Sequence, residues 1–244
     1  MKKILIILVF LIHINVEAQI AYTKAKSLAN ETIDAMGGLD GFASTKYIGW
    51  NFFGSRRLIW DKENNRVRVD YLKKQLTIIT YLHKDEGALF INGLEVMQPD
   101  SLKKYFDKAR RVWMNDSYWL IMPFKLFDSG VNLSYIGEEK STLGTNCEVI
   151  QMAFNNVGAT PENKYMIYIN KETKLVDEWK YFAKFEDENP EIINTWSDYK
   201  KYENILLSSD RGVEGKLTEI NVWKSLPEYI FLEKEIPPFD QLGK

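Results

Sequence analysis

The stretch Arg66-Val67-Arg68-Val69-Asp70-Tyr71 decides the fold class, because polar and apolar side chains alternate along it with a period of two. Successive side chains of a β-strand point to opposite faces, so Val67, Val69 and Tyr71 share one face. Comparable runs predict further strands at 47–55, 56–61, 75–82, 87–92, 132–138, 146–154, 164–170, 174–184, 192–202 and 215–224. Turn residues separate many of them, which favours one antiparallel meander of about ten or eleven strands over alternating βαβ units.

Two segments show a helical period instead. Residues 22–37 carry one apolar stripe at spacings of three and four, and a pair of glycines follows it. A second stripe opens the insertion 99–128, where Asp100 or Ser101 suits an N-cap. The rest of that insertion is apolar on every side. Near the C-terminus, we expect 229–233 to add an edge strand and the last few residues to be loose.

The first residues have the pattern of a cleaved secretory signal. Met1-Lys2-Lys3 is basic, 4–14 is an apolar run, and small residues stand at Val16 and Ala18. The run is too short to span a bilayer as a stable helix, and no later run is longer. The sequence therefore predicts a signal peptide at 1–18 and a periplasmic mature chain without a transmembrane segment.

Composition excludes several classes of function. Lys and Arg total 32 against 34 Asp and Glu, a formal net charge of −2, which argues against a nucleic-acid partner. His83 is the only histidine beyond the leader and lies in a turn, and Cys147 is the only cysteine and lies in an expected strand. Metal-ligand and phosphate-loop spacings are missing from the sequence. We therefore predict a non-enzymatic protein without a cofactor.

Several strands are apolar on both faces, notably 50–53, 76–82 and 165–169. An antiparallel sheet that faces water has one polar face, so both faces of these strands need cover. One explanation is an ordinary filled core with packing on both sides. The other is a curved sheet around an apolar interior that 99–128 plugs, with Met114 and Met122 as adaptable walls.

Six motifs follow one another along 19–244: Asp34-Ala35-Met36-Gly37-Gly38, Trp60 with Arg66 to Tyr71, His83 to Phe90, Pro123-Phe124-Lys125-Leu126, Gly144 to Ile150, and Ile167 to Trp179. In this order they resemble the LolA/LolB-like superfamily of periplasmic lipoprotein carriers and outer-membrane lipoprotein-sorting proteins, of which the chain looks like a diverged member.

The resemblance implies a single domain over 19–244. Its fold would be a strongly curved, incomplete antiparallel barrel closed by an N-terminal helix and a helical lid at 99–128, with an interior that accepts acyl chains. One departure concerns the lid. Family carriers place an Arg-Pro pair after the hairpin tryptophan, and that arginine latches the lid. Here 61–64 follows Trp60 without it, so Arg56 and Arg57 are the candidate replacements.

The sequence thus predicts a periplasmic binder or carrier of a lipid-like ligand, with a lipid or acylated protein as partner. The candidates for the lid and cavity are Trp113, Trp119, Leu120, Met122, Phe124 and Phe127, and those for the walls are Trp50, Phe52, Val67, Val69, Ile78 and Ile167. For each, an ordinary core role is the alternative. Two other functions stay open: a sensor or scaffold that binds an envelope partner protein through the same sheet, and a glycan-acting enzyme if two carboxylates converge in a groove.

Overall fold

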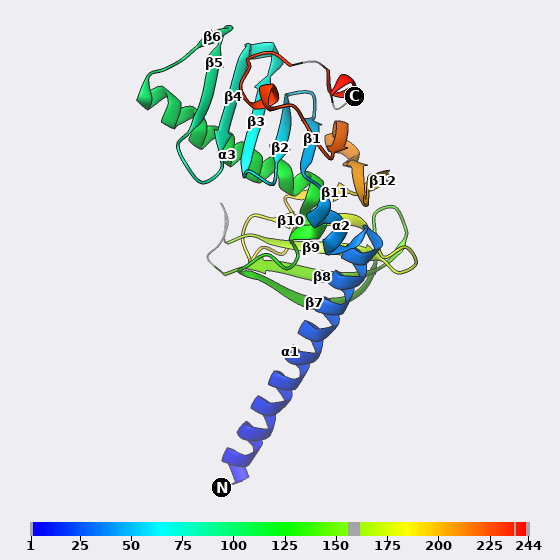
Figure 1. The fold of residues 1–244 in the computed structure, drawn as a ribbon. Helices are drawn as coiled ribbons and strands as arrows, with labels where there is room; N and C mark the ends of the chain where they lie inside the picture. The colour runs from blue at the N-terminus through cyan, green and yellow to red at the C-terminus, as the bar shows by residue number, and fades with distance from the viewer. Residues whose placement is uncertain (1, 156–161, 237, 243–244) are drawn as a thin grey trace. The chain divides into compact units, whose positions relative to one another are not determined.

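The computed structural model describes residues 2–155, 162–236 and 238–242, with side chains from Glu17 onward (Figure 1). The chain forms two compact units, and each is built from separated stretches of sequence. Unit 1 comprises Met1–Met36 and Pro123–Trp196, and unit 2 comprises Gly37–Met122 and Ser197–Lys244. The prediction of one domain over 19–244 after a leader stays a prediction.

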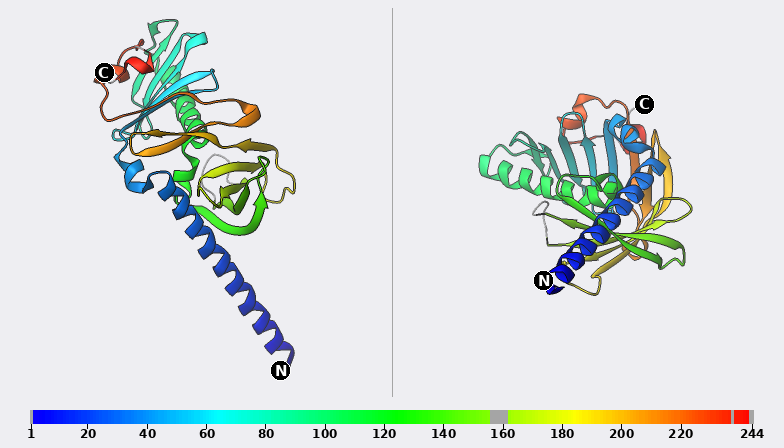
Figure 2. Two further views of the ribbon diagram at one scale, coloured as in Figure 1. Left: turned by 90° about the vertical axis from the view of Figure 1, so that its right-hand side faces the viewer. Right: turned by 90° about the horizontal axis from the view of Figure 1, so that it is seen from below.

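Unit 1 is an antiparallel sheet with one long helix. Its strands lie in the order β11-β10-β9-β8-β7. Their bounds are β7 Val131–Lys140, β8 Asn146–Phe154, β9 Lys164–Asn170, β10 Val176–Phe182 and β11 Ile192–Thr195. Helix α1, Lys2–Ala35, is continuous (Figure 2) and packs against β7. The buried side chains at its C-terminal end are Ala25, Leu28, Ala29, Thr32 and Ile33, which lie on the predicted stripe.

The end of α1 depends on a glycine. Gly37 has φ +108, a left-handed conformation that side chains other than glycine rarely adopt. A Cβ atom there would lie 2.1 Å from the backbone oxygen of Asn204.

The described helices include none with the length and apolarity needed to cross a membrane.

Unit 2 has a seven-stranded antiparallel sheet in the order β14-β1-β2-β3-β4-β5-β6 and a two-stranded sheet of β12 and β13. The strands of the large sheet are β1 Tyr47–Phe52, β2 Arg56–Asp61, β3 Arg66–Tyr71, β4 Leu76–Tyr81, β5 Gly87–Ile91, β6 Leu94–Glu95 and β14 Thr218–Trp223. The small sheet has β12 Ser197–Tyr202 and β13 Ile205–Asp210. The helices are α2 Gly38–Ser44 and α3 Pro99–Ile121, with short 3₁₀ turns η1 Leu72–Lys74, η2 Met122–Lys125, η3 Gly212–Glu214, η4 Glu228–Phe231 and η5 Phe239–Gln241.

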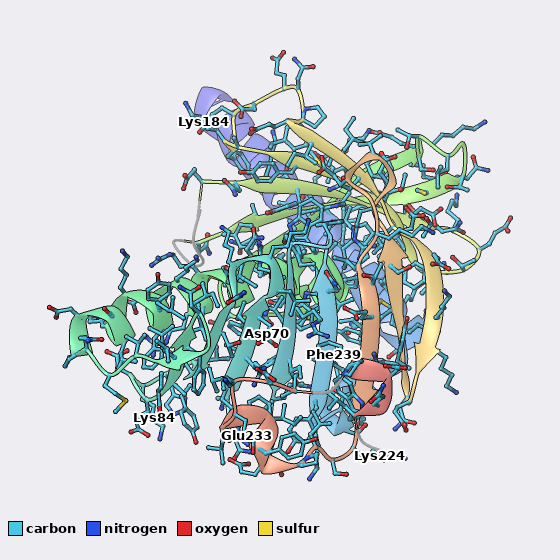
Figure 3. The ribbon with its side chains drawn as sticks, turned by 90° about the horizontal axis from the view of Figure 1, so that it is seen from above. Asp70, Lys84, Lys184, Lys224, Glu233 and Phe239 are labelled. Atoms are coloured by element: carbon cyan, nitrogen blue, oxygen red, sulfur yellow. The ribbon has the colours of Figure 1, made fainter. Side chains whose placement is uncertain are left out.

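Both faces of the seven-stranded sheet are covered. Helix α3 packs against β3, β4 and β5 on one face. The C-terminal segment, residues 226–236 and 238–242, lies on the other, where the backbone oxygen of Glu233 accepts from Arg68 on β3 and the ring of Phe239 lies against Arg57 on β2 (Figure 3). The apolar cluster under this segment is Ile59, Ile79, Trp223, Ile230, Phe231, Phe239 and Leu242. In this unit, therefore, strands that are apolar on both faces are packed on both faces.

The fold class, mainly antiparallel β with helices, is confirmed, and none of the sheets in the described residues closes into a barrel. The described residues form fourteen strands in three sheets rather than one meander. The predicted strand 192–202 is two strands, β11 and β12, which belong to different units. Strand β13 escaped prediction because its apolar residues and its serines stand in blocks instead of alternating.

Two terminal predictions are wrong. Helix α3 begins at Pro99 after Gln98, with no side-chain cap, so Asp100 and Ser101 lie inside the first turn. Proline fits this first position because its fixed φ is helical and its missing N–H would have no partner there. The expected edge strand at 229–233 is instead the turn η4, because Arg68 draws backbone carbonyls of this segment around its guanidinium. Phe239 and Leu242 are buried, but residues 243 and 244 lie outside the described residues, so looseness of the last few residues stays a prediction.

Candidate functional site

The candidate site is the face of the seven-stranded sheet beneath α3, which we call the α3 face. Neighbouring strands align Trp50 with Leu58, Leu58 with Val69, and Val69 with Ile78. Residues two apart on one strand share a face, so the α3 face carries Trp50, Phe52, Leu58, Trp60, Val67, Val69, Tyr71 and Ile78. The predicted wall residues Trp50, Phe52, Val67, Val69 and Ile78 are therefore brought together.

Helix α3 covers this face with aromatic side chains. Trp113 meets Trp60 edge to face, with 5.2 Å between ring centroids. Trp119 meets Phe52 and Phe53 in the same way, at 6.1 and 5.5 Å. These spacings suit the quadrupoles of aromatic rings. The fully buried positions of the helix are Phe106, Ala109, Asp116, Ser117, Leu120 and Ile121, which continue one stripe at helical spacing.

The other predicted lid and wall residues lie elsewhere. Met122 follows α3 and is fully buried in unit 2. Phe124, Phe127 and Ile167 belong to unit 1. There, Ile167 pairs with Ile150 and Trp179 in the middle of the five-stranded sheet, and Phe127 is half-buried. Their membership of a common cavity stays a prediction.

Three indole groups at this interface lack a hydrogen-bond acceptor. The Nε1–H donors of Trp50, Trp60 and Trp113 are buried, and none has a partner within the described part of the chain. An unsatisfied buried donor costs roughly 1–3 kcal/mol, and native proteins seldom keep one without a reason. The interface between α3 and the sheet is thus apolar in its walls and supplied with unused donors.

A buried ion pair joins the sheet to the C-terminal half of α3. The guanidinium of Arg56 on β2 donates from Nε to Oδ2 of Asp116 at 2.7 Å and from Nη2 to Oδ1 at 2.6 Å. The side chain of Asp116 is 0% exposed, whereas that of Arg56 is 18% exposed. Arg56 therefore contacts the helix, as an arginine that replaced the missing latch arginine would have to do. Arg57 lies on the opposite face, over the ring of Phe239.

The pKa shifts of the pair show which of the two charges is less favourable in the folded state. Burial raises the pKa of Asp116, and the hydrogen bonds from Arg56 offset this only in part. Burial also opposes the charge of Arg56, but Asp116 raises the pKa of the guanidinium above its usual value. The carboxylate consequently depends on Arg56 to stay ionised.

Two further arginines bind α3, one at the middle of the helix and one near its C-terminal end. Arg110 on the helix donates to the backbone oxygen of Tyr81 at 3.1 Å and to Asp85 at 2.7 Å. Arg211, which follows β13, donates from Nε to the backbone oxygen of Trp119 at 3.0 Å, and burial lowers its pKa to about 9. These polar contacts therefore bind the C-terminal half of the helix, from its middle to its last turn.

Sequence reasoning missed Asp116, Trp60 and Arg110 as parts of this interface. Asp116 carried a usable signal, since an acidic residue in register with an apolar helical stripe has to find a cation when buried. The partner of such a residue is not visible locally, because Arg56 stands on a distant strand.

Three open grooves on the described surface lie away from this interface. One of about 720 Å³ is lined by 138–140, 144–147 and 170–172 in unit 1. Two smaller ones, of about 440 and 290 Å³, are lined by residues of unit 2 that include Lys234 and Phe231 of the C-terminal segment. Residues of α3 line none of these three grooves.

The lone cysteine has the environment of a core residue. Cys147 is fully buried on β8, as predicted, and its burial raises the pKa of the thiol. A thiol with a raised pKa is a poor nucleophile. Among the described residues, the structure has no group of three or more His, Cys, Asp and Glu side chains placed to hold a metal ion.

Comparison with known proteins yields structural neighbours only. No protein-family profile matches the chain, and no curated protein does. A DUF1329 family protein from Desulfovibrio piger is 12% identical, with a TM-score of 0.44, covering 85% of this chain and 96% of that one. MucB is 12% identical, with a TM-score of 0.29, and MucB in complex with MucA(peri) is 10% identical, with a TM-score of 0.26. The matches cover 80% of this chain and 65% and 62% of the MucB chains. At these scores the likenesses carry no argument, so the resemblance to the LolA/LolB-like superfamily stays a prediction.

Proposed function

We propose that the protein is a non-catalytic binder of a lipid-like ligand, which it takes up between α3 and the α3 face in the periplasm. One observation carries this proposal: the buried indole donors of Trp50, Trp60 and Trp113 have no acceptor in an otherwise apolar interface. The leader pattern of residues 1–18 supports the location.

An acyl ester combines a hydrocarbon chain, which suits the apolar walls, with a carbonyl acceptor, which the buried indole donors lack. Its hydrocarbon chain would contact Val67, Val69 and Ile78, at about 0.8 kcal/mol for each methylene removed from water. Its carbonyl oxygen would accept from an indole N–H, which removes the cost of an unsatisfied donor. A purely hydrocarbon ligand would gain the free energy of burying its methylenes but would form no hydrogen bond to an indole N–H.

Uptake requires α3 to move, because its aromatic side chains now lie against the face. Besides the apolar packing, its polar contacts are few: Arg56 with Asp116, Arg110 with the β4–β5 turn, and Arg211 with Trp119. Such contacts exchange readily with water when the helix is displaced, so a hinged helix is a suitable gate.

The test is a binding comparison of two probes with one chain length, a fluorescent acyl ester and the matching alkyl hydrocarbon. In the double variant Trp60→Phe/Trp113→Phe, the rings stay but both donors are lost. We expect the ester to bind about three- to tenfold more weakly, in line with one or two net hydrogen bonds, and the hydrocarbon to bind as to the wild type.

Trp223→Phe is the matched control. The indole N–H of Trp223 donates to the backbone oxygen of Leu242 on the opposite face, so its loss should leave ester binding unchanged. The proposal fails if neither probe binds the wild-type protein and native mass spectrometry of gently purified protein finds no lipid. Equal weakening in the control variant would likewise overturn it.

A further inference from the structure

A cluster of lysines lies beside α3 on the exposed surface of unit 2. The ammonium of Lys108 stands 4.6 Å from the ring centroid of Tyr71, and that of Lys74, from turn η1, stands 5.8 Å from the same ring. Lys104 and Lys108 both lie over Tyr105, at 6.0 and 5.8 Å. The turn between β3 and β4 and one side of α3 thus bring three positive charges to two aromatic rings.

These charges are not neutralised. Within the described part of the chain, Lys74, Lys104 and Lys108 form no ion pair. The neighbouring side of the same helix is different, since Lys103 and Arg110 both pair with Asp107.

The crowding is unfavourable in the absence of an anion. Lys104 and Lys108 are four residues apart on the helix, where like charges face each other and destabilise it. Burial lowers the pKa of Lys108, and repulsion from Lys74, Arg56 and Lys104 lowers it further. A bound anion would turn this repulsion into attraction.

We propose that Lys74, Lys104 and Lys108 form a binding site for a phosphate-type oxyanion over Tyr71, between α3 and the β3–β4 turn. Each ammonium offers three rotatable donors and a compact charge, which suits the oxygens of a phosphoryl group. Two sources share this chemistry, the headgroup of an anionic phospholipid and a free phosphate group. The site does not depend on the acyl-binding proposal, because inorganic phosphate has no apolar part.

The first experiment titrates the full chain with inorganic phosphate at constant ionic strength, followed by calorimetry and ³¹P line broadening. Constant ionic strength is needed because salt screens exposed charges. We expect Lys104→Gln/Lys108→Gln to weaken binding at least about tenfold, and Lys74→Gln, which leaves the helix unchanged, to weaken it several-fold. Lys103→Gln removes the same charge from the next helical position and should bind as the wild type does.

The second experiment measures co-sedimentation with vesicles of phosphatidylglycerol or of phosphatidylcholine. Selective binding to phosphatidylglycerol that is lost in the double variant assigns the site to a lipid headgroup. Phosphate binding without vesicle binding assigns it to a free phosphate group. The site does not exist if the wild type binds neither phosphate nor phosphatidylglycerol vesicles, or if Lys103→Gln weakens binding as much as the double variant does.

Discussion

Arg56 and Asp116 differ in how much water each would regain if its partner were lost. Arg56 keeps part of its surface in solvent, whereas Asp116 has none. Arg56→Met should therefore lower the free energy of unfolding by about 3–5 kcal/mol, the usual cost of an uncompensated buried charge. Asp116→Ala should cost less, about 1–3 kcal/mol. Urea denaturation at pH 7 measures both, with exposed Arg111→Met as a control that should cost under about 0.5 kcal/mol.

The same variant makes a prediction about pH. Without Arg56, the hydrogen bond from Asn115 alone opposes the effect of burial on Asp116, so the folded-state pKa rises further above the unfolded value of about 3.9. The folded state then binds more protons than the unfolded state between these two pKa values. Relative to the wild type, the stability of Arg56→Met should therefore be highest below about pH 4 and fall as the pH rises through the folded pKa of Asp116. A variant that instead gains stability relative to the wild type over this range would contradict an ionised Asp116 at the interface.

The sequence predicts well which strand residues of the site share one face of the sheet. Trp50 with Phe52, and Val67 with Val69, share a face because alternation is a local property of a strand. The contacts of Trp60 and Asp116 are not local, since each depends on where α3 lies across the sheet. Phe124 and Ile167 were grouped with them on apolarity alone, which does not distinguish the cores of two units.

At the scale of elements, α1 is fixed to the sheet of unit 1 by a polar triad. Lys24 on the helix pairs with Glu148 on β8 at 3.1 Å, and the hydroxyl of Tyr135 on β7 donates to the same carboxylate at 2.6 Å. Burial opposes the charge of Glu148, but Tyr135 and Lys24 outweigh it and lower its pKa, while Glu148 raises that of Tyr135 to about 12.

The triad should make the docking of α1 sensitive to acid. Because the folded pKa of Glu148 is lowered, its contribution is present above the unfolded pKa of about 4.3 and is lost as the pH falls through the folded pKa. Tyr135→Phe should shrink this pH-dependent part, and hydrogen exchange of the α1 amides at pH 7 should become faster. Thr23→Ala, on the exposed side of the helix, should leave the exchange rates unchanged.

The C-terminal segment depends on one guanidinium. Arg68, which is 1% exposed, donates to the backbone oxygens of Ile230, Glu233 and Lys234 and to Asp70. Arg68→Met would leave these acceptors without a donor. We expect amides around 230–234 to lose hydrogen-exchange protection while those of α3 keep theirs. Equal loss on α3 would mean that the segment and the helix open together.

This segment also shows where sequence fails at the scale of elements. The 229–233 stretch has the composition of a strand, and a strand would need a free sheet edge to pair with. Instead, Arg68 in the middle of the sheet face binds the backbone oxygens of this stretch. Long-range demand of this kind overrides local propensity. The long apolar stripe of α3 and the alternating strands were predictable because their own periods are strong.

At the scale of the whole molecule, each unit has its own sheet and its own core. Ile78 in unit 2 and Ile167 in unit 1 are both 0% exposed and form a matched pair of sites. Replacing either by Ala should cost about 2–5 kcal/mol. Native-state hydrogen exchange should show lost protection in β1–β5 and β14 for Ile78→Ala, and in β7–β11 for Ile167→Ala. Loss throughout the chain in both variants would show a single cooperative unit instead.

Strand β1 pairs with β14, so that Tyr47 faces Trp223 near the other end of the chain. A ribosome therefore releases β1 long before its partner is made. Until β14 arrives, β1 presents an open edge of unpaired backbone groups, which is a template for other chains. Loss of β14 would thus favour aggregation of the nascent protein, in addition to its effect on the folded structure.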